Sequence, residues 1–145
     1  MPVADNRALV ERMHQRLLET RDVDVLDEFF SPDVVSHNRR PGMAEGIAGI
    51  KEFFAAWRDA LPDARVELGP VVAEGDLVAI RSVTTGTHEG ALESLPATGV
   101  KVSVDGIDIV RVEDGLIVEH WGLTDIAGLL RQIGPALGGG AAPEA

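Results

Sequence analysis

The sequence predicts a single α+β domain, and three observations lead to this prediction. Apolar residues recur at helical spacing in the N-terminal part of the chain and again near its C-terminal end. Between these parts, from residue 64 to residue 124, apolar and polar residues alternate as they do in strands. The length of 145 residues suits one domain with a buried core. We therefore expect helices to cover one face of a curved antiparallel sheet, which leaves a conical interior for a ligand.

Three helices are predicted ahead of the main strands. They span residues 9–17, 22–30 and 47–61, and the third has the clearest helical pattern. His14 lies on the charged side of the first helix, where we expect it to face solvent. The apolar residues that form the stripes of these helices are Leu9, Val10, Met13, Leu17, Val23, Leu26, Phe30, Ile47, Ile50, Phe54, Trp57 and Leu61.

Strands are predicted mainly in the second half of the chain. A short strand at 34–38 is followed, after the third helix, by strands at 66–73, 77–88, 100–113 and 116–122. The last two form a hairpin around Asp114-Gly115, a strong two-residue turn signal.

A short final helix runs from Ile126 to Ile133 and ends at Gly134-Pro135. We expect one domain over residues 1–135, followed by a flexible tail at 136–145.

The composition excludes several classes of function. The net charge of −11, from 24 acidic and 13 basic residues, argues against nucleic acid or an anionic membrane as a partner. The absence of cysteine excludes disulfides, thiolate catalysis and thiolate metal sites. The N-terminus lacks the apolar core of a signal peptide, and no apolar run is long enough to span a bilayer. We therefore expect a cytoplasmic protein without a nucleotide-binding motif.

Asp108, His120 and Asp125 are candidate acid/base groups because each lies at or near a strand end, flanked by apolar residues. Asp125 directly precedes the last helix, so it serves either as a helix N-cap or as a base. Thr124 could cap the helix instead and leave Asp125 to face inward. The sequence leaves both roles open.

His120 follows Glu119 and precedes Trp121 on the last predicted strand. Period-two alternation places His120 on one face and Glu119, Trp121 and, nominally, Asp125 on the other. The strand must therefore end or bulge before Asp125 if that residue and His120 are to share a pocket. His120 either orients a substrate, hydrogen-bonds a carboxylate or lies on the outer face of the sheet.

Asp108 lies between two isoleucines, so its burial depends on the register of the strand. A buried carboxylate is costly without a partner, which makes Asp108 either a functional acid or the partner of Arg81 or Arg111.

Further side chains could line the interior of the cone. His88 lies in a glycine-flanked segment, where it either donates or accepts at the rim of a pocket or is a structural loop residue. His37, at the end of the short strand, could line the mouth of the cone. The substrate-binding residues that we predict are His37, His88, Asp108, Trp121, Trp57 and Phe54. Three histidines could in principle hold a metal, but no two have a close ligand spacing, and we expect none.

Ordered motifs from His37 to Gly134 resemble the SnoaL-like polyketide cyclase family, whose members are often labelled ester cyclases. The resemblance includes Asp114-Gly-Leu-Ile-Val-Glu-His-Trp121 and the later Asp125. The further matching segments are Leu61-Pro-Asp63, Ala73-Glu-Gly-Asp-Leu-Val-Ala-Ile-Arg81, Gly86-Thr-His-Glu-Gly90, Ala97-Thr-Gly99, Gly106-Ile-Asp-Ile-Val-Arg111 and Gln132-Ile-Gly134. The family's usual Gly-Ile-Pro-Pro-Thr-Gly reads Ser94-Leu-Pro-Ala-Thr-Gly99 here.

The resemblance implies the cone-shaped barrel of the nuclear transport factor two-like superfamily, which ketosteroid isomerase and limonene epoxide hydrolase share. It also implies intramolecular aldol cyclisation of an apolar, carbonyl-bearing small molecule, without metal or cofactor, and a homodimer. Asp125 would remove the proton α to a carbonyl, and His120 with His88 or His37 would hold the enolate. The chain has no tyrosine, so the phenolic donor of ketosteroid isomerase is absent. A ligand-binding protein, or a hydrolase or isomerase on the same fold, is the alternative.

Overall fold

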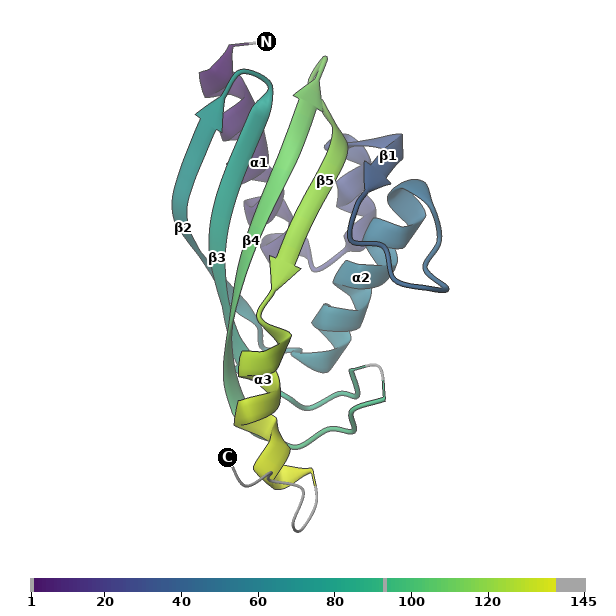
Figure 1. Cartoon of the computed structure of the whole chain (residues 1–145), viewed down its shortest axis with the longest axis vertical. Coiled ribbons are helices and arrows are strands. Elements are labelled where there is room, and N and C mark those ends of the chain that lie inside the picture. The colour runs from purple at the N-terminus through teal and green to yellow at the C-terminus, as the bar shows by residue number, and fades with distance from the viewer. Residues whose placement is uncertain (1, 93, 138–145) are drawn as a thin grey trace.

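The computed structural model describes residues 2–92 and 94–137, and it is built from a curved sheet with helices on one side (Figure 1). The elements in chain order are α1 (Val3–Thr20), a 3₁₀ helix (Val23–Glu28), β1 (Phe30–Ser36), α2 (Gly46–Ala60), β2 (Arg65–Glu74), β3 (Leu77–Thr87), β4 (Lys101–Glu113), β5 (Leu116–Thr124), α3 (Ile126–Ile133) and a 3₁₀ turn (Gly134–Ala136).

The five strands form one sheet in the order β1-β5-β4-β3-β2. The pairs β2–β3, β3–β4 and β4–β5 are antiparallel, as predicted. The pair β1–β5 is parallel, which the sequence analysis did not anticipate. No hairpin links these two strands, because α2 and three strands separate them in the chain, so no tight turn fixes their relative direction.

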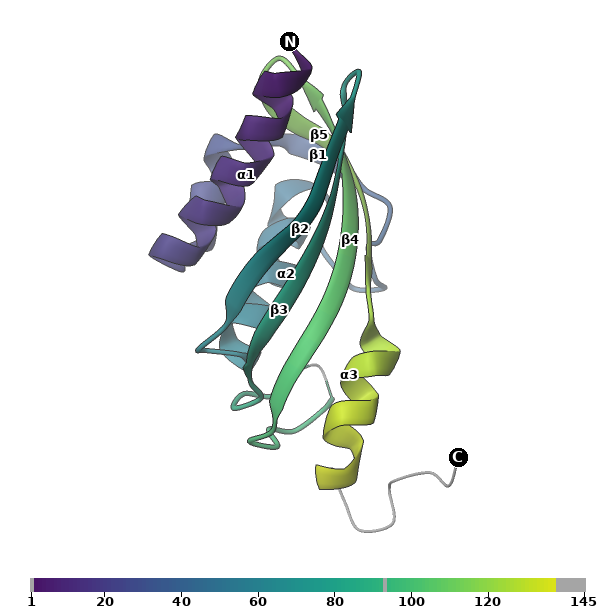
Figure 2. The ribbon, with the colours of Figure 1, turned by 90° about the vertical axis from the view of Figure 1, so that its left-hand side faces the viewer.

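The helices α1 and α2 lie on the same side of the sheet, and Figure 2 shows the other side uncovered along most of its length. The core between these helices and the sheet contains Val10, Leu26 and Ile117, each fully buried. A second apolar cluster, which includes Leu61, Leu129 and Ile133, joins the end of α2 to α3. The fold is therefore the α+β arrangement that the sequence predicts, with apolar clusters toward both ends of the helix-covered face.

The segments 61–63 and 86–90, both quoted in the sequence analysis, meet where α2 and β3 end. The Asp63 carboxylate accepts hydrogen bonds from the Thr87 backbone N–H at 2.7 Å and from the Thr87 hydroxyl at 2.8 Å. Gly86 permits this approach, because a Cβ at that position would lie only 3.1 Å from the Leu61 Cβ. These contacts attach the turn after α2 to the end of β3 and lower the pKa of Asp63.

The element bounds differ from the predictions mainly at their ends. The predicted second helix, 22–30, is a 3₁₀ helix that ends at Glu28, and β1 already begins at Phe30. The predicted tail, 136–145, falls largely on residues 138–145, which lie outside the described residues. Within 2–92 and 94–137, no helix is both long and apolar enough to cross a membrane.

We expect Asp63→Asn to destabilise the fold at neutral pH, because the neutral amide accepts hydrogen bonds less strongly than a carboxylate does. Hydrogen bonding lowers the folded-state pKa of Asp63, so its stabilisation is present above the unfolded carboxyl pKa and is lost as the pH falls through the folded value. Urea unfolding of both proteins between pH 7 and pH 3 should show the difference in stability shrinking as the pH falls. A difference that is constant over this range would contradict the assignment.

Candidate active site

A cavity of about 380 Å³ lies between the helices and the inner face of the sheet. Its volume falls within the range of small-molecule sites. Phe54 and Trp57 of α2, two of the predicted substrate-binding residues, form part of its mostly apolar wall. Five polar residues along the cavity wall are His14, Ser36, Asn38, Asp108 and His120.

Ser36, His120 and Asp108 form a hydrogen-bonded chain along the wall of the cavity. The His120 Nε2 atom lies 2.8 Å from Asp108 Oδ1, and its Nδ1 atom lies 3.3 Å from Ser36 Oγ. An ionised carboxylate only accepts hydrogen bonds, so Nε2 carries the proton in the neutral ring and Nδ1 accepts from the serine hydroxyl. Three strands, β1, β5 and β4, thus each contribute one member of this chain.

The strand register explains why Asp108 and His120 meet. Asp108 is paired with Gly122 and Val110 with His120, so Asp108 and His120 are diagonal neighbours on the inner face of β4 and β5. Gly122 is essential to this contact, since a Cβ there would overlap the Asp108 carboxylate and lie 3.0 Å from the His120 ring. The carboxylate therefore occupies space that only glycine leaves open.

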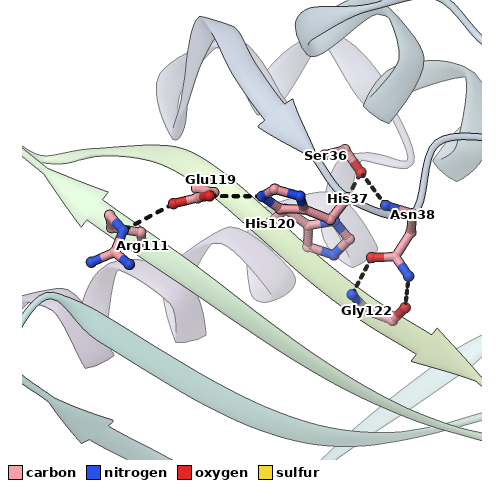
Figure 3. A network of polar contacts seen from close by, with 7 residues as sticks. All are labelled: Ser36, His37, Asn38, Arg111, Glu119, His120 and Gly122. Atoms are coloured by element: carbon pink, nitrogen blue, oxygen red, sulfur yellow. Dashed lines mark hydrogen bonds and ion pairs between the residues drawn. The ribbon is translucent and has the colours of Figure 1, made fainter.

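The segment after β1 fixes the same part of β5 (Figure 3). The Asn38 side chain donates to the Gly122 carbonyl and accepts from the Gly122 N–H. The His37 backbone N–H donates to the His120 carbonyl at 2.9 Å. Together these bonds continue the parallel pairing of β1 with β5 beyond the end of β1, and they hold Ser36 beside His120.

His14 lies on the opposite wall of the cavity, although the sequence analysis expected it to face solvent. Its Nδ1 atom lies 3.0 Å from the Val10 carbonyl, one helical turn earlier. Burial lowers the pKa of His14, against smaller opposing effects of the Val10 hydrogen bond and of Asp108. The sequence did contain a sign of this inward position. His14 lies four residues after Val10 and three before Leu17, and both of these residues belong to the apolar stripe of the helix.

Two of the predicted substrate-binding residues lie on the outer face of the sheet. The rings of His37 and Trp121 stack there at 4.9 Å and 9°. His37 Nε2 lies 2.7 Å from Glu119, which also accepts a hydrogen bond from Arg111 at 3.0 Å (Figure 3). These two partners, His37 first, lower the pKa of Glu119. Neither His37 nor Trp121 is among the described residues that line the cavity.

Asp125 caps the last helix. Its carboxylate accepts a hydrogen bond from the Gly128 N–H at 2.9 Å, and Gly128 leaves the room that this carboxylate needs. Strand β5 continues to Thr124, with no bulge between His120 and Asp125, so these two residues do not meet in the cavity. Of the two roles that the sequence left open, the geometry of Asp125 is that of the N-cap.

His88 is buried in the segment after β3, where its Nδ1 atom lies 3.0 Å from the Thr98 hydroxyl. It does not line the cavity. The residues of 2–92 and 94–137 contain no group of three histidine or acidic side chains placed to hold a metal.

The arginine partner expected for Asp108 is absent, because Arg81 and Arg111 point to the other face of the sheet. Arg81 pairs with Asp105 at 3.1 Å, and Arg111 pairs with Asp76 at 2.7 Å as well as with Glu119. His120 is the partner of Asp108 instead. Side chains alternate between the two faces of β3 and β4, and Arg81 and Arg111 both lie on the face opposite to Asp108. Alternation would therefore have excluded both arginines once Asp108 was known to face inward.

We expect Gly122→Ala to separate Asp108 from His120, because the added methyl group would displace the carboxylate. Overpacking of this kind costs about 1–3 kcal/mol, so the variant should still fold. The measurement is the ¹⁵N and ¹H NMR signals of the His120 ring, which should lose the features of an Nε2–H bonded to a carboxylate. Ring signals equal to those of the unsubstituted protein would contradict the role given to Gly122.

Comparison with known proteins identifies the family of this chain. Residues 8–133 match the family described as SnoaL-like polyketide cyclase. The aklanonic acid methyl ester cyclase of Streptomyces peucetius is 29% identical over 134 residues, which cover 87% of this chain and 88% of the relative. The nogalonic acid methyl ester cyclase of Streptomyces nogalater is 27% identical over 79% of this chain and 87% of the relative.

Solved structures with the same fold include TsrD from Streptomyces laurentii, with a TM-score of 0.82 at 31% identity, over 92% of this chain and 98% of that one. AclR from Streptomyces galilaeus, a candidate hydroxylase, has a TM-score of 0.79 at 28% identity, over 92% of this chain and 83% of that one. The fold therefore hosts more than one suggested chemistry. The match over residues 8–133 extends through nearly all the described elements, and the chain belongs to the SnoaL-like polyketide cyclase family.

Proposed function

We propose that this protein catalyses an intramolecular aldol-type ring closure of an apolar, carbonyl-bearing small molecule without a cofactor. The observation that carries the proposal is the hydrogen-bonded chain Ser36–His120–Asp108 in a mostly apolar cavity. Such a chain can hold a proton and return it to an atom that gains negative charge. The low polarity around it strengthens its hydrogen bonds with a bound substrate.

In this mechanism the chain acts at the substrate's oxygen. Ring closure converts a carbonyl oxygen into an alkoxide, which needs a hydrogen bond as it forms and a proton once it has formed. When His120 carries two protons, it donates one toward Asp108 and one toward Ser36, and the serine hydroxyl is then free to donate to the alkoxide. Family membership supports this reaction class, because the two named relatives are cyclases of aklanonic and nogalonic acid methyl esters.

Asp125 has a structural role in this proposal, because its carboxylate is occupied by the N-cap bond to Gly128. The resemblance to the family had instead suggested it as the base. The two assignments make opposite predictions for a matched pair of variants, each of which replaces an aspartate by the isosteric asparagine.

We expect Asp108→Asn to lower kcat by about 100-fold, since general acid/base groups contribute about 10²–10⁴-fold. Asp125→Asn should keep kcat within about 3-fold, because asparagine caps helices as well as aspartate does. The assay is conversion of aklanonic or nogalonic acid methyl ester to a cyclised isomer of equal mass, followed by chromatography and mass spectrometry.

The reverse result, with Asp125→Asn inactive and Asp108→Asn active, would transfer the role to Asp125. Tight binding of either ester without conversion by the unsubstituted protein would instead support a ligand-binding function.

We further propose that the protein is a homodimer that associates through the uncovered face of the sheet. Ile107 is paired with Leu123, and Ile109 with Trp121, on this face. Leu123 is 78% exposed and Ile107 55%, so an apolar patch lies open to solvent. A second copy placed against this patch would bury both pairs, which agrees with the dimer that the family resemblance implies.

We expect Ile107→Asp to convert the dimer to a monomer, because a charge in the middle of an apolar interface loses its hydration. Val3→Asp is the matched control, since Val3 is also exposed and apolar but lies on α1, on the other side of the sheet. Sedimentation velocity of the three proteins tests the proposal. An unsubstituted protein that sediments as a monomer would refute it.

A further inference from the structure

In the imidazole of His14, one nitrogen has a hydrogen-bond partner and the other has none among the described residues. The Val10 carbonyl can only accept, so Nδ1 carries the proton of the neutral ring. Nε2 is then an unprotonated acceptor. It has no hydrogen-bond partner among the described residues, yet it is not sealed from solvent as the buried His88 Nε2 is. Because His14 lines the cavity, Nε2 is a proton acceptor available to a bound molecule.

The placement of His14 complements the chain on the opposite wall. His14 belongs to α1, whereas Asp108 and His120 belong to the sheet, so a molecule in the cavity has an acid/base group on each side. An aldol closure has two proton transfers, because a proton leaves a carbon at one end of the reacting unit and a proton reaches an oxygen at the other. Groups on opposite walls of the cavity can divide these two transfers between them. The mechanism above provides for the oxygen only.

We propose that His14 is the base that removes the proton from the substrate's α-carbon. This inference rests on the proposed function for its biological meaning, although the proton transfer itself does not require ring closure. It assigns a catalytic role to a residue of α1 that neither the motifs nor strand parity identified.

His14 Nε2 takes the α-proton, and the C–H electron pair becomes the enolate. The enolate carbon bonds to the second carbonyl carbon, whose π pair moves to oxygen, and that oxygen receives a proton from the Ser36–His120–Asp108 chain. After the product leaves, His14 releases its proton to water and the chain regains one, so the substrate is only isomerised.

The electrostatic surroundings suit this role. Burial lowers the pKa of His14, which keeps the ring neutral and able to accept a proton near pH 7. The negative charge of Asp108 acts in the other direction and favours the imidazolium once the proton has been transferred. The other charged or titratable residues that line the cavity in the described part of the chain are Arg21, Arg40, Arg58, Asp105 and His120. The Asp105 carboxylate itself pairs with Arg81 on the outer face of the sheet.

The test uses 2-tetralone, an apolar bicyclic ketone, as the probe in D₂O. NMR follows the exchange of its α-protons for deuterium, which needs a base but no ring closure. We expect His14→Gln to lower the protein-catalysed exchange rate by at least 10-fold, with the dissociation constant of 2-tetralone changed by less than 3-fold. Glu11→Gln, an exposed substitution three residues earlier on α1, is the control and should exchange at the unsubstituted rate.

A second measurement does not depend on a variant that folds. In ¹⁵N-histidine spectra of the unsubstituted protein at pH 7, Nε2 of His14 should give the signal of an unprotonated nitrogen and Nδ1 that of a protonated one. The inference is overturned by an Nε2–H tautomer, by exchange that survives His14→Gln in a folded protein, or by exchange no faster than in buffer. Exchange that depends on His14, without conversion of either methyl ester, would support the base and refute the cyclase proposal.

Discussion

The antiparallel ladder between β4 and β5 is the constraint on which the site depends. Its register places Asp108 opposite Gly122 and Val110 opposite His120, so two polar side chains meet on the inner face. A shift by one residue would exchange the faces and bring Ile109 and Trp121 inward. The same register determines both the hydrogen bond in the cavity and the apolar patch on the other side of the sheet.

The elements and the family could be predicted from the sequence because they depend on local patterns. The helical stripe of α2 and the Asp114-Gly115 turn specify structure within a few residues of themselves. The parallel pairing of β1 with β5 could not be predicted in this way, since it joins segments about 80 positions apart through contacts that no local pattern records.

The candidate site could be predicted only in part, for physical reasons that differ by residue. His120 and Asp108 were recognised as candidates. Alternation shows which residues share a face of a strand, but it does not show which of the two faces packs against the helices. His14 was assigned to solvent because its neighbours on α1 are charged, although helix geometry also places it beside Val10 and Leu17. The choice between cap and base for Asp125 required the position of the Gly128 N–H.

Gly122 has an evolutionary consequence. Its missing side chain is the space that the Asp108 carboxylate fills, so a side chain at 122 and a carboxylate in this position at 108 exclude each other. A lineage that acquired a side chain at 122 would also have to shorten or remove the acid at 108. Under the proposed mechanism, another residue would then have to supply the proton-transfer group. Residues 108 and 122 should therefore co-vary among homologues, and a pair of exchanged residues there would mark a relocated catalytic group within an unchanged fold.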